Sequence, residues 1–130
     1  MSQESQEEQF RKKLDPQRYA VLREKATEPP FSGKLLNNHE NGDYLCAACH
    51  QVIFSSQTKF DSHSGWPSFF EPENRSAVIL KEDNSLNNPR VEVCCAKCGS
   101  HLGHVFDDAY DQPGGKRYCI NSLSLEFIKK

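Results

Sequence analysis

Long apolar runs are absent from this 130-residue chain, and no stretch approaches the roughly 20 apolar residues that cross a bilayer. We therefore expect no membrane partner. The first residues, Met1–Glu8, are acidic and contain neither an apolar segment nor arginine, so we expect neither a secretory signal nor a transit peptide. The expected location is the cytoplasm, which is a reducing compartment.

A basic stripe is also missing. The 16 basic and 18 acidic residues are scattered along the chain and give a formal net charge of −2. Proteins whose main ligand is nucleic acid concentrate lysine and arginine on one face or in one segment. We therefore expect no nucleic-acid partner.

Hydrophobic residues make up only 36% of the chain, which is little for a core that must be stable without help. The length suits a single domain. The chain does contain six cysteines, and in a reducing compartment these indicate metal binding or thiol chemistry before disulfides. We therefore expect one domain with a structural staple.

The chain divides at about residue 28 into two patterns. Residues 1–28 are charged, with apolar positions at Phe10, Leu14, Val21 and Leu22, and Asp15-Pro16 is typical of a helix start. This predicts one or two short amphipathic helices packed on the main body. Residues 29–130 are predicted to form a small, mainly β domain with antiparallel strands at 44–46, 52–54, 76–80, 90–94, 117–121 and 123–127, and loops at 83–85 and 112–115.

Two Cys-x-x-Cys knuckles, Cys46/Cys49 and Cys95/Cys98, are separated by 45 residues. Each knuckle places two sulfurs on one side of a tight turn, so two facing knuckles complete a tetrahedral shell around zinc. Such a shell leaves no open position for chemistry. We therefore predict one structural Zn²⁺ per chain, which stabilises only the folded state.

Other pairings of these cysteines are possible. A redox-active Cys-x-x-Cys pair would be expected beside a βαβ pattern, which this chain does not show. Cys94 with Cys98 could also supply ligands, although the tighter knuckle favours Cys95. A Cys2His2 site built from Cys95, Cys98, His101 and His104 would leave the first knuckle unexplained.

Cys119 is the cysteine farthest from the knuckles. On a strand, alternation places Arg117, Cys119 and Asn121 on one face. A cation two residues away favours thiolate over thiol, and Asn121 could bond the backbone or a substrate. Burial as an inert thiol is the alternative, since this is a common fate of free cysteine.

Several motifs in this order resemble those of the B-type methionine sulfoxide reductases, which are specific for the R-epimer. The resemblance runs from about Thr27 to Phe127. It rests on both knuckles and on the segments Thr27-Glu28-Pro29-Pro30-Phe31-Ser32-Gly33, Gly65-Trp66-Pro67-Ser68-Phe69, His101-Leu102-Gly103-His104-Val105-Phe106 with Asp108, and Arg117-Tyr118-Cys119-Ile120-Asn121-Ser122.

The resemblance implies a mechanism in which the Cys119 thiolate attacks the sulfoxide sulfur. The sulfoxide oxygen leaves poorly unless it is protonated, and the resemblance makes His104 the acid, with His101 nearby. Asp108 and Arg117 would set orientation and charge. The products would be methionine and a sulfenic acid on Cys119.

The resemblance also implies the substrate pocket, the fold and the partners. Trp66 would help to hold the substrate's methyl group, and Phe106 and Asn121 would also contact the substrate. Without the resemblance, Trp66 would be interpreted as a core aromatic residue and the two histidines as surface or loop residues. The implied fold has two antiparallel sheets, short N-terminal helices and a zinc site away from Cys119. The implied partners are methionine-R-sulfoxide, either free or in proteins, and thioredoxin or another thiol. The implied role is the repair of proteins damaged by oxidative stress.

One position departs from the family pattern. Many members have a resolving cysteine where this chain has Ser64, which cannot form a disulfide with Cys119. An external thiol would then reduce the sulfenic acid directly. Cys94 is a possible substitute, but it adjoins the predicted zinc site.

A zinc-ribbon module that binds protein or nucleic acid, with Cys119 merely structural, is the alternative function. It predicts a basic or aromatic-rich surface, whereas this chain is mildly acidic and its single tryptophan lies in a family motif. It also assigns no purpose to the segment around Cys119.

Overall fold

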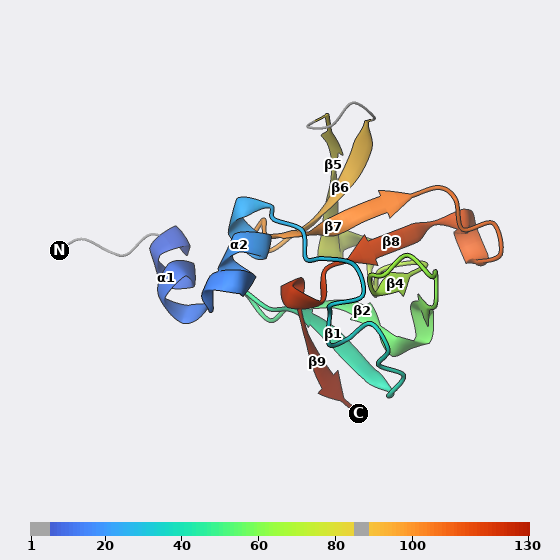
Figure 1. The fold of residues 1–130 in the computed structure, drawn as a ribbon, viewed down its shortest axis with the longest axis horizontal. Helices are drawn as coiled ribbons and strands as arrows, with labels where there is room; N and C mark the ends of the chain where they lie inside the picture. Colours follow the sequence, from blue (N-terminus) through green and yellow to red (C-terminus); the bar gives the residue numbers. More distant parts are fainter. Residues whose placement is uncertain (1–5, 85–88) are drawn as a thin grey trace.

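Two antiparallel sheets and two short N-terminal helices make up the computed structural model, which describes residues 6–84 and 89–130 (Figure 1). The small sheet has the order β2 (Val52–Ser55), β1 (Gly42–Cys46), β9 (Leu125–Lys129). The large sheet has the order β3 (Lys59–Phe60), β4 (Ser68–Phe69), β8 (Arg117–Ile120), β7 (His101–Phe106), β6 (Arg90–Cys95), β5 (Val78–Asp83). The predicted mainly β fold with two antiparallel sheets is confirmed.

The N-terminal helices are α1 (Gln6–Lys13) and α2 (Pro16–Glu24), which lie at one end of the sheets (Figure 1). The predicted start of α2 is confirmed, because the Asp15 side chain caps the helix by accepting from the Arg18 amide at 2.8 Å. Val21 and Leu22 of α2 are buried, and this helix contacts β7. Neither helix in the described part of the chain is long and apolar enough to cross a membrane. The domain boundary at residue 28 stays a prediction.

An aromatic cluster fills the space between the sheets. Phe54 of the small sheet stacks on Phe69 of the large sheet, with ring centroids 4.3 Å apart, and Tyr44 meets the Phe69 ring edge-on at 5.0 Å. All three side chains are fully buried. Burial of each such ring contributes roughly 1.5–3 kcal/mol, so this cluster anchors β4, which lies beside β8.

Two strands begin later than the sequence predicts, because side chains divert the backbone first. The Asn74 side chain accepts from the Ser76 amide and caps a 3₁₀ turn over Arg75–Ala77, so β5 runs over 78–83 rather than 76–80. The Glu28 carboxylate accepts a hydrogen bond from the Leu123 amide at 2.9 Å, within the 3₁₀ turn over Ser122–Ser124. Strand β9 therefore begins at Leu125 rather than at residue 123. The predicted loop at 83–85 begins too early, because Asp83 still pairs with Arg90 and ends β5. Ser85 of this loop lies outside the described residues.

Strand β7 was not predicted, because its two histidines and central glycine do not look like a strand. Gly103 pairs with Ile120 of β8, and a Cβ at Gly103 would lie only 2.0 Å from the Cys119 carbonyl oxygen. Glycine therefore permits the close approach of β7 to β8 beside Cys119.

Candidate active site and metal centre

The register of the large sheet brings the predicted active-site residues together. Cys119 on β8 is directly opposite His104 on β7 and Ser68 on β4, and Arg117 is opposite Phe106. Directly paired residues project from the same face of a sheet. One face of three adjacent strands therefore carries the reactive groups.

The Cys119 sulfur accepts a hydrogen bond from the Arg117 guanidinium, Nη1 to Sγ 2.6 Å. The Asp108 carboxylate holds the same guanidinium through two bonds, of 2.8 and 2.9 Å, and the Phe106 ring lies 4.5 Å beneath it. The Asp108 hydrogen bond raises the pKa of Arg117, and Arg117 in turn lowers the pKa of Asp108. A permanent cation thus lies against the sulfur.

Two serine hydroxyls also lie close to this sulfur. Ser64 Oγ lies 3.5 Å and Ser68 Oγ 3.7 Å from the Cys119 Sγ, and Ser62 Oγ bridges the two serines at 2.8 and 2.6 Å. Such hydroxyls can donate to a thiolate or to an oxygen placed on the sulfur.

A pocket of about 280 Å³ opens over Cys119. Its lining residues are Thr27, Ser64, Trp66, Arg90, Gly103, His104, Phe106, Arg117, Cys119 and Asn121. The Trp66 indole donates to the Glu28 carbonyl at 3.0 Å, which fixes the ring as one wall. The Asn121 side chain accepts from the Glu28 amide and donates to the Leu102 carbonyl, so Asn121 braces the pocket by bonding backbone.

The two predicted histidines occupy different environments. His104 lines the pocket and bonds Asp83, Nε2 to Oδ2 2.8 Å. His101 is buried outside the pocket lining and bonds Glu92, Nδ1 to Oε2 2.8 Å. Burial lowers the pKa of His101, and Glu92 opposes this only in part. Of the predicted catalytic and substrate-binding residues, His101 and Asp108 are the two that do not line the pocket; Asp108 acts on it through Arg117.

Four residues around the site have no role assigned by the sequence: Glu28, Ser68, Asp83 and Glu92. Glu28 and Ser68 lie inside the family motifs at 27–33 and 65–69, so their position in the sequence could have marked them as site residues. Their contacts could not be predicted from the sequence. Asp83 was interpreted as a loop residue, and Glu92 alternates with valines as a solvent-facing strand residue would. Both instead point at histidines.

The four knuckle cysteines form one cluster in which all sulfurs lie within 4.8 Å of one another. The Sγ atoms of Cys46 and Cys98 are 3.7 Å apart, and those of Cys49 and Cys95 are 3.5 Å apart. Four sulfurs arranged tetrahedrally at about 2.3 Å from a zinc ion would be about 3.8 Å apart. The cluster therefore fits a metal ion.

Both knuckles have the same local geometry. His50 donates its amide to the Cys46 carbonyl and Gly99 donates to the Cys95 carbonyl, each at 2.8 Å, and both His50 and Gly99 have positive φ. One knuckle follows β1 of the small sheet and the other follows β6 of the large sheet. A bound ion would thus cross-link the two sheets.

The donor set suits a soft cation. Hydrogen bonds within the cluster lower the pKa of the Cys98 thiol and raise the pKa of the Cys46 thiol. Cysteine sulfur is a ligand type that zinc prefers. Cys94 lies outside the cluster, as do His101 and His104, so the alternative ligand sets are not assembled. None of the six cysteines, all of which lie in the described part of the chain, forms a disulfide.

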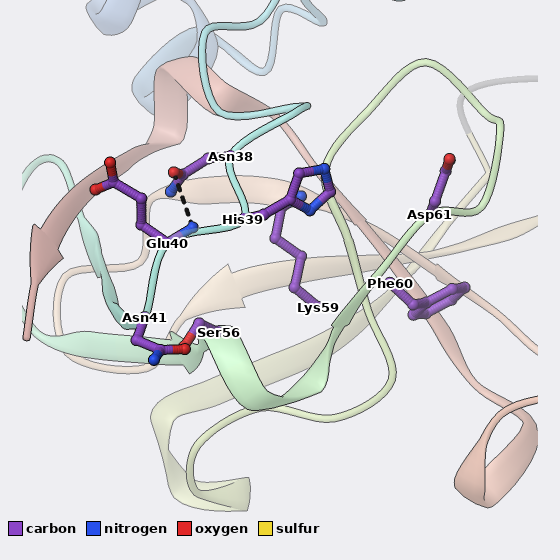
Figure 2. Close-up of a pocket in the computed structure, with 8 residues that line it drawn as sticks. All are labelled: Asn38, His39, Glu40, Asn41, Ser56, Lys59, Phe60 and Asp61. Atoms are coloured by element: carbon purple, nitrogen blue, oxygen red, sulfur yellow. Dashed lines mark hydrogen bonds between the residues drawn. The ribbon is translucent and has the colours of Figure 1, made fainter.

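A second hollow, of about 230 Å³, lies beside β3 (Figure 2). Its lining is polar and includes Lys59, whose amine donates to the Leu36 carbonyl at 2.8 Å and whose pKa is lowered by burial. None of the predicted site residues lines it. The Cys119 pocket is therefore the candidate active site.

Comparison with known proteins identifies the family of the chain. The SelR domain family matches residues 14–129. A peptide methionine sulfoxide reductase MsrB of Methanosarcina barkeri (strain Fusaro / DSM 804) is 57% identical over 124 residues, which are 95% of this chain and 87% of the relative. A protein of the same name from Leptospira interrogans is 50% identical over 124 residues, covering 95% of this chain and 94% of the relative.

The crystal structure of the Mis18 'Yippee-like' domain has a TM-score of 0.53 at 16% identity, covering 70% of this chain and 98% of that one. This likeness shows a shared fold alone. The SelR match and the 50–57% identical relatives span nearly the whole chain, and they show that the chain belongs to the B-type methionine sulfoxide reductases of the SelR family.

Proposed function

We propose that this protein reduces the R-epimer of methionine sulfoxide, free or in proteins, with Cys119 as the nucleophile. The observation that carries the proposal is the Arg117 guanidinium 2.6 Å from the Cys119 sulfur, in a pocket that His104 and Trp66 also line. A stabilised thiolate, a proton donor and an apolar wall are what this reaction needs. Repair of oxidised proteins follows as the biological role.

The reaction transfers oxygen and two electrons between two sulfur atoms. The Cys119 thiolate attacks the sulfoxide sulfur while His104 delivers a proton to the sulfoxide oxygen. The S–S bond formed by this attack and the S–O bond of the substrate then break as the hydroxyl group passes to the Cys119 sulfur, which leaves a sulfenic acid on Cys119 and releases methionine. The substrate sulfur is reduced by two electrons, and the Cys119 sulfur is oxidised by two.

Zinc is proposed as the structural metal, held by Cys46, Cys49, Cys95 and Cys98. Four protein thiolates close its coordination shell, so the ion would supply stability and no catalytic water. The reaction would then depend on the residues of the Cys119 pocket alone.

The proposed function predicts strict selection between the two sulfoxide epimers. The resolved R- and S-sulfoxides of a blocked methionine are supplied with dithiothreitol, and methionine is measured by chromatography. We expect the R-epimer to be consumed and the S-epimer to remain. Trp66, His104 and Cys119 can receive the methyl group, the oxygen and the sulfur of the substrate together in only one configuration of the sulfoxide sulfur. Comparable turnover of both epimers would contradict the assignment of the pocket.

Recycling is proposed to need an external thiol, such as thioredoxin, because Ser64 lies at the family's resolving position. After a single turnover without reductant, we expect Cys119 to hold a sulfenic acid that a dimedone-type reagent traps. Mass spectrometry of the trapped peptide measures this. A Cys94–Cys119 linked peptide with the loss of two thiols would show instead that Cys94 resolves the intermediate.

Ser64→Cys provides the matched gain-of-function test. Ser64 Oγ is 3.5 Å from the Cys119 Sγ, so a small movement would bring two sulfurs to the disulfide length of about 2.05 Å. We expect dimedone trapping at Cys119 to fall and a 64–119 disulfide to form after one turnover. Unchanged trapping would mean that the 61–66 loop does not approach Cys119 closely enough.

A further inference from the structure

A buried carboxylate lies behind the histidine of the Cys119 pocket. Asp83 ends β5, and β6 separates β5 from β7 in the sheet, so the His104 side chain crosses β6 to reach it. The Nε2–Oδ2 distance is 2.8 Å, and the side chains of Asp83 and His104 are 4% and 11% exposed. Asp83 does not line the pocket, so it can act on a substrate only through a pocket residue that it contacts. These are His104, at 2.8 Å, and Arg90, at 3.5 Å, and His104 is the nearer.

This contact decides which ring nitrogen can serve the substrate. A carboxylate accepts hydrogen bonds, so His104 Nε2 carries the hydrogen and Nδ1 is left over. Nδ1 bears a proton only when the ring is an imidazolium, and the Asp83 carboxylate lies against the other ring nitrogen. After Nδ1 has given up its proton, the ring is already the neutral Nε2–H tautomer and keeps its bond to Asp83.

Four strands bring charged and titratable groups to His104. Asp83 on β5 bonds it, Glu92 on β6 and Cys119 on β8 are paired opposite it, and the His101 ring on β7 lies 5.4 Å away. Arg90 on β6 and Arg117 on β8 line the same pocket. Glu92 is committed to His101 and to the Lys25 amine, at 2.8 and 3.3 Å. Arg90 lies 3.5 Å from Asp83 and lines the pocket. Asp83 therefore supplies the negative charge in contact with His104, and the same carboxylate oxygen also faces the Arg90 guanidinium.

We propose that Asp83 is the positioning residue of the active-site acid, holding His104 as an Nε2–H donor so that Nδ1 delivers the proton. This rests on the proposed function, in which His104 is the acid. It extends the site to a strand end that contributes nothing to the pocket surface.

The test is the pH dependence of single-turnover reduction of an R-sulfoxide peptide by Asp83→Asn. Loss of the carboxylate leaves the ring beside Arg90 with no intervening negative charge, so the acid form should disappear at lower pH. We expect the alkaline limb of the rate profile to shift to lower pH by about one to two pH units. At a pH above the shifted limb, each unit of this shift should make the single-turnover rate about tenfold lower than that of the parent. Asp83→Glu, which keeps the charge, should recover part of the rate.

Asp43→Asn is the matched control, because Asp43 is a strand carboxylate of the small sheet that pairs with Lys130 at 3.4 Å. Its profile should overlay that of the parent. In a His104→Ala background, Asp83→Asn should cause no further slowing, because the group it acts through is gone.

These outcomes separate the inference from the proposed function. His104→Ala as fast as the parent would show that the acid itself is wrongly assigned, and Asp83 would lose its role with it. A slow His104→Ala together with a parent-like Asp83→Asn profile would overturn the inference alone.

A measurement on the unmutated protein covers the case in which Asp83→Asn fails to fold. Long-range ¹H–¹⁵N spectra of the imidazole groups report which ring nitrogen carries the hydrogen. We expect the neutral form of His104 to be the Nε2–H tautomer. The Nδ1–H tautomer would overturn the inference.

Discussion

Cys119→Ser should abolish the reduction of methionine sulfoxide, with a loss on the order of a thousandfold or more in single turnover. A serine hydroxyl is not ionised at neutral pH, so the Arg117 guanidinium beside it has no anion to stabilise. The substitution is nearly isosteric at a site that already contacts two hydroxyls, those of Ser64 and Ser68. We therefore expect folding and metal content to be unchanged.

Stopped-flow or quenched single-turnover assays measure the chemistry, and circular dichroism with elemental analysis checks the fold. Cys94→Ala is the control, because Cys94 lies outside both the Cys119 pocket and the sulfur cluster. It should retain near-parent single-turnover activity. Substantial turnover by Cys119→Ser would assign the nucleophile to another group.

Loss of the metal should unfold the protein rather than slow its chemistry. Elemental analysis should find about one zinc per chain, and Cys49→Ser should remove it. Structural zinc binding is worth on the order of 10 kcal/mol in small zinc domains, comparable to or larger than the whole stability of a typical domain. Cys49 is the partly exposed member of the cluster, so its replacement disturbs the core least.

Thermal unfolding of Cys49→Ser, and of the parent treated with a chelator, provides the measurement. Both should melt far below the parent, and addition of zinc should restore the chelated parent but not the variant. Cys94→Ala should keep its zinc. A metal-free chain that remains folded and fully active would contradict the structural role of the cluster.

The sequence predicted those parts of the fold that short segments specify. The start of α2 follows from Asp15 and Pro16, and the strands at 44–46, 52–54, 90–94 and 117–121 follow from short runs of strand-forming residues separated by turn residues. The two knuckles predicted the sulfur cluster with its members correctly chosen, because each places two sulfurs on one turn. β7 was missed because Gly103 and two histidines suit a strand only when β8 lies against them.

The site residues also fall into those that the sequence predicted and those that only the tertiary structure brought together. Chain spacing alone put Arg117 and Cys119 on one face of a strand, and their 2.6 Å contact needs nothing more distant. Family motifs, not periodicity, pointed to His104 and Trp66, and only the sheet register brings them to Cys119.

The sequence by itself therefore determined the two knuckles that form the sulfur cluster and the family of the chain, because these depend on residue type and on neighbours within a few positions. Tertiary structure decided which acid faces which histidine, where Trp66 is held and which hydroxyls surround Cys119. The Asp83–His104 bond joins residues 21 apart across an intervening strand, and the Trp66–Glu28 bond joins residues 38 apart. Such contacts depend on strand order and register, because shifting a strand by one residue turns every side chain to the opposite face.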